Sequence, residues 1–181
     1  MAAPYQAELR ATFERLIDAV GLDERQQDFF KSRWLDQVVW MEGKAAKAQR
    51  WYYRLRLVTV VGAVTVPALV SLSALGGSAG EAATIATWIV SLIVAVSAAI
   101  EGFFQFGQRW RNYRGTVERL KMEGWLFLQR AGPYSADAAS PANTYAVFAS
   151  RVEELIKTDV DVYLTEVAVE KQKEQEPAQR A

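Results

Sequence analysis

A row of small and weakly polar side chains near the middle of the chain ends in a carboxylate. Its members recur every three or four residues: Thr84, Thr87, Ser91, Val94, Ala98 and Glu101. This spacing places them on one face of an α-helix. When several such helices surround a lumen, hydroxyl groups and a ring of carboxylates can conduct and select cations. The row is therefore a candidate pore lining, with Glu101 at its mouth.

Each part of this interpretation has an alternative that needs no pore. Serine and threonine hydroxyls also bond to the carbonyl groups of their own helix or to a neighbouring helix. Glu101 also suits the end of a membrane span, where a carboxylate reaches water or pairs with Arg54 or Arg56. Pro67, in the preceding apolar run, predicts a bend that either acts as a gate or is a tolerated kink.

Several kinds of chemistry are excluded by composition. The chain contains no cysteine and no histidine, which rules out thiol catalysis, disulfides, histidine acid–base chemistry and metal sites built on thiolate or imidazole. The adjacent carboxylates Glu153 and Glu154 have no glycine-rich phosphate loop or nucleophile elbow beside them. We therefore expect no enzyme activity, no cofactor and no metal ion.

Two long apolar runs must position the candidate row. Residues 57–80 carry no charged side chain, and neither do residues 82–100. About 19 helical residues, rising about 1.5 Å each, cross the roughly 30 Å hydrocarbon core of a bilayer. A chain of 181 residues has too little other sequence to bury two helices that are apolar on all sides. The sequence predicts a two-span transmembrane hairpin over residues 57–106, with its loop at about residues 76–81.

Basic side chains flank this hairpin but are absent from its loop. They form a collar before the first span and after the second: Lys44, Lys47, Arg50, Arg54, Arg56, Arg109, Arg111 and Arg114. Lysine and arginine gather on the cytoplasmic side of membrane proteins. We predict a multi-pass protein of the inner (plasma) membrane with both termini in the cytoplasm. Beside a span, the collar suits anionic lipid better than nucleic acid, so no nucleic acid partner is expected.

Aromatic residues occur in the same two stretches of sequence as the collar, before the first span and after the second. They are Trp51, Tyr52, Tyr53, Phe103, Phe104, Phe106 and Trp110. Amphipathic rings are enriched where the hydrocarbon core meets water. The aromatic residues therefore predict the position of the cytoplasmic membrane boundary.

The apolar pattern continues beyond the spans with heptad spacing. Pairing the two flanks about residue 79 sets Trp34 against Gly124, so that a large residue faces a small one. In the spans the same register sets Gly62 against Val96. We predict two long helices, over about residues 24–75 and 82–130, that form an antiparallel hairpin and continue as a cytoplasmic coiled-coil stalk.

Further helices complete an all-α membrane protein. An apolar stripe in residues 5–20, ended by Gly21, predicts a first helix, and Asp23 with Gln26 predicts a capping box for the next. Ser140 and Pro141 predict the N-cap and first turn of a C-terminal helix. The expected domains are cytoplasmic N-terminal helices and stalk over residues 1–56, the hairpin over 57–106, cytoplasmic stalk and C-terminal helix over 107–170, and a disordered tail over 171–181.

The residues at the two ends of the hairpin resemble those of the SLATT family. The sequence WYYRLRL enters the first span and RWRNYRGTVERLKMEGWLF leaves the second, followed by Tyr134 and residues 148–154. SLATT proteins are prokaryotic two-transmembrane effector domains that associate with SMODS and SLOG proteins, which synthesise and sense nucleotides in defence systems. The resemblance covers about residues 30–165. It implies a membrane effector that oligomerises and permeabilises or depolarises the membrane, with a separate nucleotide-sensing or signalling protein as its partner.

These observations favour a homo-oligomeric membrane effector, an ion-conducting or pore-forming protein of an antiphage defence system that is triggered from the cytoplasm. The alternative is a non-conducting membrane anchor or scaffold for a cytoplasmic partner. Two spans cannot enclose a lumen alone, because a helical pore needs several helices around it. The lipid bilayer and further copies of the chain are therefore the expected partners, and oligomeric state distinguishes the two functions.

Overall fold

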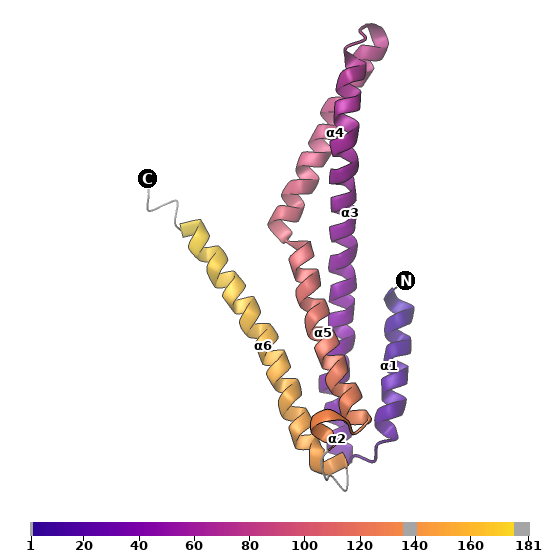
Figure 1. The fold of residues 1–181 in the computed structure, drawn as a ribbon, viewed down its shortest axis with the longest axis vertical. Helices are drawn as coiled ribbons and strands as arrows, with labels where there is room; N and C mark the ends of the chain where they lie inside the picture. Colours follow the sequence, from indigo (N-terminus) through magenta and orange to yellow (C-terminus); the bar gives the residue numbers. More distant parts are fainter. Residues whose placement is uncertain (1, 136–140, 176–181) are drawn as a thin grey trace. The chain divides into compact units, whose positions relative to one another are not determined.

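A computed structural model describes residues 2–135 and 141–175, and every regular element in these residues is a helix. The all-α prediction is confirmed for this part of the chain. In order, the elements are α1 (Ala2–Asp18), α2 (Glu24–Phe29), the π-helical η1 (Phe30–Leu35), α3 (Asp36–Ser73), α4 (Gly77–Phe104), α5 (Phe106–Leu128), the 3₁₀ turn η2 (Gly132–Tyr134) and α6 (Pro141–Gln175) (Figure 1).

The chain divides into two compact units. Residues 1–43 and 112–181 form one, here called the core unit, and residues 44–111 form the other, here called the apolar unit. The core unit contains the buried hydrophobic cluster. The apolar unit contains α3 from Lys44 onward, all of α4 and the start of α5.

The first helices of the core unit begin and end at the predicted signals. α1 ends shortly before Gly21, whose φ of 76° is the left-handed conformation that glycine adopts without strain. The carboxylate of Asp23 accepts a 2.8 Å bond from the Gln26 backbone N–H, and the Gln26 side chain accepts one of 3.3 Å from the Asp23 N–H. These two bonds confirm the capping box. Helix then continues through α2, η1 and α3 from Glu24 to Ser73.

The π-helical segment η1 was not predicted from the sequence. A π turn closes a bond between residues five apart, and it therefore aligns positions that an α-helix would separate. Phe30, Trp34 and Leu35 are all buried in it. The wider turn thus directs three large apolar side chains into one core.

Trp34 lies at the centre of the core unit. Its ring centroid is 5.0 Å from that of Phe13 in α1 and 4.9 Å from that of Phe30, both with edge-to-face geometry. Its indole N–H donates a 2.9 Å hydrogen bond to the carbonyl of Leu120 in α5. A Cβ atom added to Gly124 would collide with the indole ring. The predicted pairing of Trp34 with Gly124 is confirmed.

α6 joins this core through its first half. Phe148 and Val152 are fully buried, and the Phe148 ring stacks on Phe30 with centroids 4.4 Å apart. The predicted N-cap, Ser140, lies outside the described residues. α6 is helical through Gln175, and residues 176–181 of the predicted tail also lie outside the described part.

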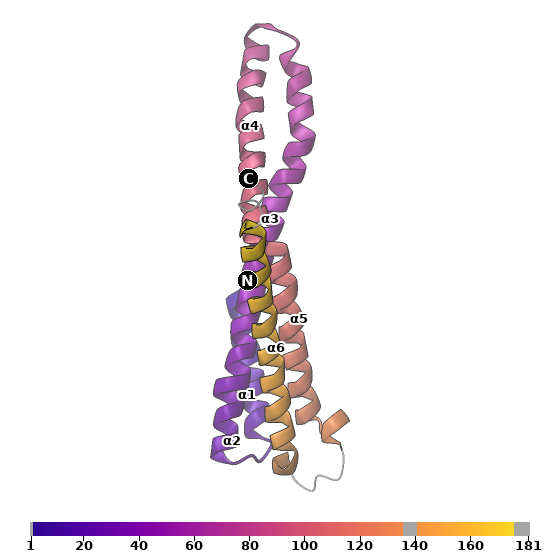
Figure 2. The same ribbon diagram turned by 90° about the vertical axis from the view of Figure 1, so that its left-hand side faces the viewer.

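In the apolar unit, a short glycine connection joins α3 to α4 (Figure 2). Gly76 and Gly77 have φ values of 72° and 65°, which side chains with a Cβ rarely adopt. The Gly80 N–H already bonds to the Gly76 carbonyl at 3.2 Å. Most of the stretch predicted as loop, residues 76–81, is therefore the first turn of α4.

The second long helix is interrupted at one residue. Gln105 separates α4 from α5 and has the left-handed φ of 49°. Its N–H donates a 2.8 Å bond to the Glu101 carbonyl, and its own carbonyl accepts a 3.0 Å bond from Arg109. The predicted helix over residues 82–130 is therefore two helices with a bend between them.

The helix register expected inside the apolar unit is wrong. Gly62 lies against Val94 and Val90, not against Val96. The α4 residues that are buried are Gly80, Ala83 and Ser97, whereas the residues expected at the seam are exposed: Ile85, Ile89, Leu92, Val96 and Ala99. The left-handed residue at 105 changes the helical phase, so a heptad register taken from α5 does not carry into α4.

Candidate functional site

The aromatic residues predicted at one level make ring contacts inside the apolar unit. From α3, Trp51 stacks on Phe106 with centroids 6.1 Å apart, and Tyr52 stacks on Trp110 at 6.1 Å. Phe104, the last residue of α4, stacks on Phe106 across the Gln105 bend at 5.4 Å. Further contacts join Tyr52 to Tyr53, Tyr53 to Trp110, and Phe103 to Phe104. The seven rings, here called the aromatic layer, therefore form two groups. Trp51, Phe106, Phe104 and Phe103 connect α3 to both sides of the bend, and Tyr52, Tyr53 and Trp110 connect α3 to α5.

The basic collar belongs to the same apolar unit as this layer, with one exception. Its residues are exposed, and six of them form no ion pair with any described residue: Lys47, Arg50, Arg54, Arg56, Arg109 and Arg111. Arg114 belongs to the core unit, where it pairs with Glu42 at 3.1 Å and with Glu118 at 2.7 Å. Arg114 is therefore held by two carboxylates, unlike those six residues.

The candidate pore row is divided between two faces of α4. Thr84, Ser91 and Ala98 are exposed, whereas Thr87, Val94 and Glu101 are half-buried. Val94 lies against Gly62 of α3. The hydroxyls of Thr84 and Thr87 donate to the carbonyls of Gly80 and Ala83, at 2.9 and 2.8 Å. Within one chain, half of the row thus faces the seam with α3, and both threonines bond to their own helix.

Glu101 lies at the bend that ends α4. Its side-chain Oε1 would be 3.6 Å from a Cβ atom built on Gly107, and Tyr52 would be closer still. Among the described residues, no ion pair joins this carboxylate to Arg54 or Arg56. Glu101 is therefore a half-buried carboxylate beside the aromatic layer.

Pro67 lies within α3 and does not end it. A proline removes one backbone N–H and the hydrogen bond that it would donate to the residue four positions earlier. Hydroxyls bond to nearby carbonyls on both sides of it, from Thr65 to Val61 at 2.8 Å and from Ser71 to Pro67 at 3.0 Å. Neither bond reaches the carbonyl of Ala63, which is the one that Pro67 leaves without its backbone donor.

Both helices of the apolar unit expose large apolar side chains. Val64 of α3 is 74% exposed, and Trp88 and Leu92 of α4 are 75% and 66% exposed. Only 11% of the most apolar stretch of each helix is buried. The core helices of a soluble protein would instead be mostly buried.

Two buried polar clusters in the core unit were missed by the sequence reasoning. In the first, the Glu42 carboxylate accepts hydrogen bonds from Lys121 at 2.7 Å and from Arg114 at 3.1 Å. Burial lowers the pKa of Lys121, but its bonds to Glu42 and Glu118 outweigh that effect and leave the pKa raised. A sequence signal existed, because Glu42 and Lys121 each adjoin a member of the apolar stripe, Met41 and Leu120.

The second cluster is centred on Glu123 of α5. Its carboxylate accepts hydrogen bonds from the Tyr134 hydroxyl at 2.6 Å and from two nitrogens of Arg151 at 3.0 and 2.6 Å. Desolvation raises the pKa of Glu123, but the hydrogen bonds from Arg151 and Tyr134 lower it by more. The pKa is therefore below its ordinary value. This carboxylate joins α5, η2 and α6.

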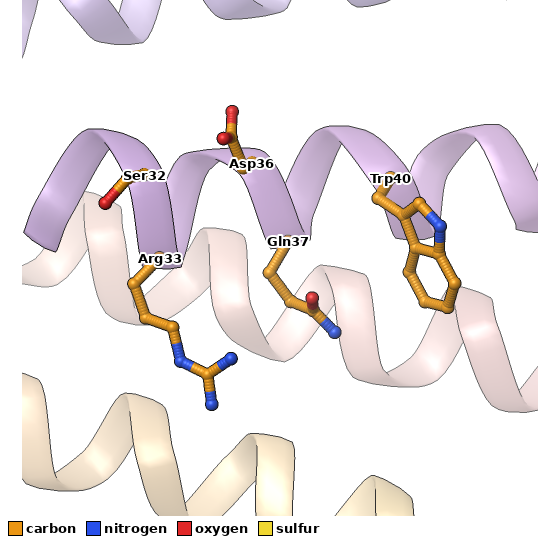
Figure 3. A pocket seen from close by; sticks show the side chains of 5 residues that line it. All are labelled: Ser32, Arg33, Asp36, Gln37 and Trp40. Carbon is orange, nitrogen blue, oxygen red and sulfur yellow. The ribbon is translucent and has the colours of Figure 1, made fainter.

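A shallow hollow on the core unit offers no convergent set of groups. Its lining residues are Ser32, Arg33, Asp36, Gln37 and Trp40, and their side chains point in different directions (Figure 3). Arg33 is engaged by Glu153 and Asp36 by Arg10. In the described residues, no group of three acidic side chains is placed to hold a metal ion.

The fold and the exposed helices define an all-α protein with two helices long and apolar enough to cross a membrane. Residues 36–142, more than half of the chain, match the family DUF4231, which is described as a protein of unknown function. The chain belongs to this family. The match begins with α3 and includes α4, α5 and η2. No curated protein and no solved structure matches the chain.

Proposed function

We propose that the apolar unit crosses the inner membrane as an antiparallel helical hairpin, with both termini in the cytoplasm. The observation that carries this proposal is the exposure of large apolar side chains along both α3 and α4. Exposing such an apolar surface to water is unfavourable in free energy, whereas contact with lipid tails is not. The contacts of Trp51 with Phe106 and Gly62 with Val94 pair the two helices in opposite chain order, as a hairpin requires.

The orientation in this proposal follows from charge. The collar residues lie at the open end of the hairpin, whereas the connection at residues 74–76 contains no basic side chain. The positive-inside bias then places the open end, and the core unit with it, in the cytoplasm.

A reporter experiment tests the membrane topology. A reporter that is active only in the periplasm is expected to be active when fused after Gly77 and inactive at either terminus. The reason is that only the connection between α3 and α4 reaches the periplasm. Activity of a cytoplasmic reporter at Gly77 would contradict the two-span proposal. A fusion in the core unit after Gly115, which has open space around it, serves as the matched cytoplasmic control.

Within the membrane, we propose a homo-oligomeric effector that conducts ions when a cytoplasmic signal reaches the core unit. The exposed half of the candidate row, with Thr84, Ser91 and Ala98, supplies small and weakly polar side chains that are not used in the seam with α3. The resemblance to the SLATT family supports a role in prokaryotic defence, with a separate nucleotide-sensing or signalling partner. Several copies are needed, since two helices enclose no lumen.

A non-conducting membrane scaffold for a cytoplasmic partner is the second candidate. It is favoured by the threonine hydroxyls, which bond to their own helix, and by Val94, which packs in the seam. Neither feature needs a water-filled pore. A monomer or dimer after extraction in detergent would favour the scaffold, and a larger ring the pore.

The ion selectivity of Glu101 variants distinguishes the pore from the scaffold. If each subunit adds one carboxylate to a pore mouth, Glu101→Gln reduces cation preference and Glu101→Lys shifts it toward anions, while the oligomer keeps its size. The measurement is the reversal potential in planar bilayers under a salt gradient. Glu81→Gln, which neutralises the other carboxylate of the apolar unit, is the control. Normal conductance with unchanged selectivity would remove Glu101 from the pore. No conductance from assembled wild-type protein, tested with its trigger present, would favour the scaffold.

A further inference from the structure

The charge of the apolar unit is strongly positive at one end. The unit contains seven basic side chains and two carboxylates, Glu81 and Glu101. Glu81 lies in the first turns of α4, next to the connection. Six of the basic residues have no ion-pair partner among the described residues, as noted above. In the core unit, Arg10, Arg33, Arg114 and Arg151 each pair with a carboxylate, whereas Arg15, Arg25 and Arg119 form no ion pair with a described residue.

Three of these cations share one face of α3. Lys47, Arg50 and Arg54 are spaced three and four residues apart, which aligns them along a helix, and all three are exposed. Trp51 and Tyr53 beside them are 42% and 53% exposed, although their rings also contact the aromatic layer. The surface thus combines unpaired cations with amphipathic rings directly before the apolar run that begins at Leu57.

We infer that this face of α3 is a binding surface for the headgroups of anionic phospholipids. The inference rests on the proposed membrane insertion, because insertion places the face at headgroup level. Guanidinium groups bind phosphate oxygens with two parallel hydrogen bonds, and basic residues near an anionic leaflet are attracted to it. Exposed tryptophan and tyrosine rings pack at the same depth. A headgroup satisfies both features, since its phosphate meets the cations while its acyl chains cover the adjoining apolar helix.

The test measures which lipids the detergent-solubilised full chain retains. Equal amounts of phosphatidylglycerol and phosphatidylcholine are added, and bound lipids are counted by native mass spectrometry. The expected result is a clear excess of bound phosphatidylglycerol, which weakens at high salt because exposed charges are screened. Each cation near an anionic lipid surface contributes about a fivefold preference. The triple variant Lys47→Gln, Arg50→Gln, Arg54→Gln is therefore expected to lose at least about tenfold of the excess.

Two further variants make the outcome specific. The triple variant Arg15→Gln, Arg25→Gln, Arg119→Gln removes the same charge from exposed positions of the core unit and is expected to keep the excess. Arg50→Lys with Arg54→Lys preserves charge and is expected to retain most of it. Equal retention of both lipids by the wild type, or an equal loss in both triple variants, would overturn the inference.

Membrane insertion is measured separately on the same protein. Carbonate-washed membranes that retain the chain support the proposed function, and then only the lipid counts decide the inference. A chain released by carbonate contradicts both proposals. A third outcome is that the wild type shows no headgroup preference, while a DNA oligonucleotide binds to it and not to the triple variant Lys47→Gln, Arg50→Gln, Arg54→Gln. The surface would then bind nucleic acid, and the lipid inference would fail.

Discussion

Replacing Trp34 with alanine is expected to lower the free energy of unfolding by about 3–5 kcal/mol, as large aromatic deletions in a core do. The ring is fully buried among Phe13, Phe30 and Phe148, and its removal also leaves the Leu120 carbonyl without its indole donor. In a protein of this size the melting temperature should fall by roughly 6–20 °C. Far-UV circular dichroism of the detergent-solubilised chain measures this change.

Gly124 provides the matched test of the same contact. Gly124→Ala is expected to cost about 1–3 kcal/mol, because the added Cβ meets the indole ring. On the same helix, Gly115→Ala meets nothing within 4 Å and should stabilise α5 by up to about 1 kcal/mol through helix propensity. In the Trp34→Ala background the cost of Gly124→Ala should disappear. A cost that persists there would show that the ring is not what excludes a side chain at position 124.

The Glu123 cluster is expected to make stability depend on pH. Glu123→Gln should lower the free energy of unfolding at pH 7 by about 2–3 kcal/mol, since it weakens hydrogen bonds to a charged acceptor whose side chain is only 5% exposed. The pKa of Glu123 is lowered in the folded chain from its ordinary value of 4.5. Its stabilisation is therefore complete above about pH 4.5 and is lost as the pH falls through the lower folded value. Urea unfolding of the wild type and variant at pH 7 and pH 3 measures the difference.

An exposed ion pair of the same geometry is the control. Arg33 donates two hydrogen bonds to Glu153, at 2.7 and 2.8 Å, but both side chains are nearly half exposed. Solvent screens such a pair, and Glu153→Gln should cost only about 0–1 kcal/mol. Equal costs for Glu123→Gln and Glu153→Gln would mean that burial adds nothing to the cluster. If the wild type exceeds Glu123→Gln in free energy of unfolding by the same amount at pH 3 as at pH 7, the difference comes from packing and not from the charge of Glu123.

The sequence was sufficient for features that depend on neighbouring residues. The apolar runs, the capping box at Asp23 and the left-handed Gly21 each follow from short-range periodicity, side-chain hydrogen bonding or backbone sterics. The seam between Trp34 and Gly124 was also predictable, because a large and a small residue occupy matching positions of two heptad stripes. These features determined the helical class, the two candidate spans and most helix boundaries.

Other features depend on contacts that sequence spacing does not specify. Glu42 and Lys121 are 79 residues apart, and nothing in either local pattern states that one charge neutralises the other. Gln105 is not a residue type that marks a bend, and the aromatic rings packed around it come from three helices. Its left-handed backbone, and the π turn at Phe30–Leu35, each shift the helical phase. An irregular turn costs free energy that only the packing of the assembled helices can compensate. Packing between helices therefore decided where the two irregular turns occur. In this way it also decided which face of α4 meets α3.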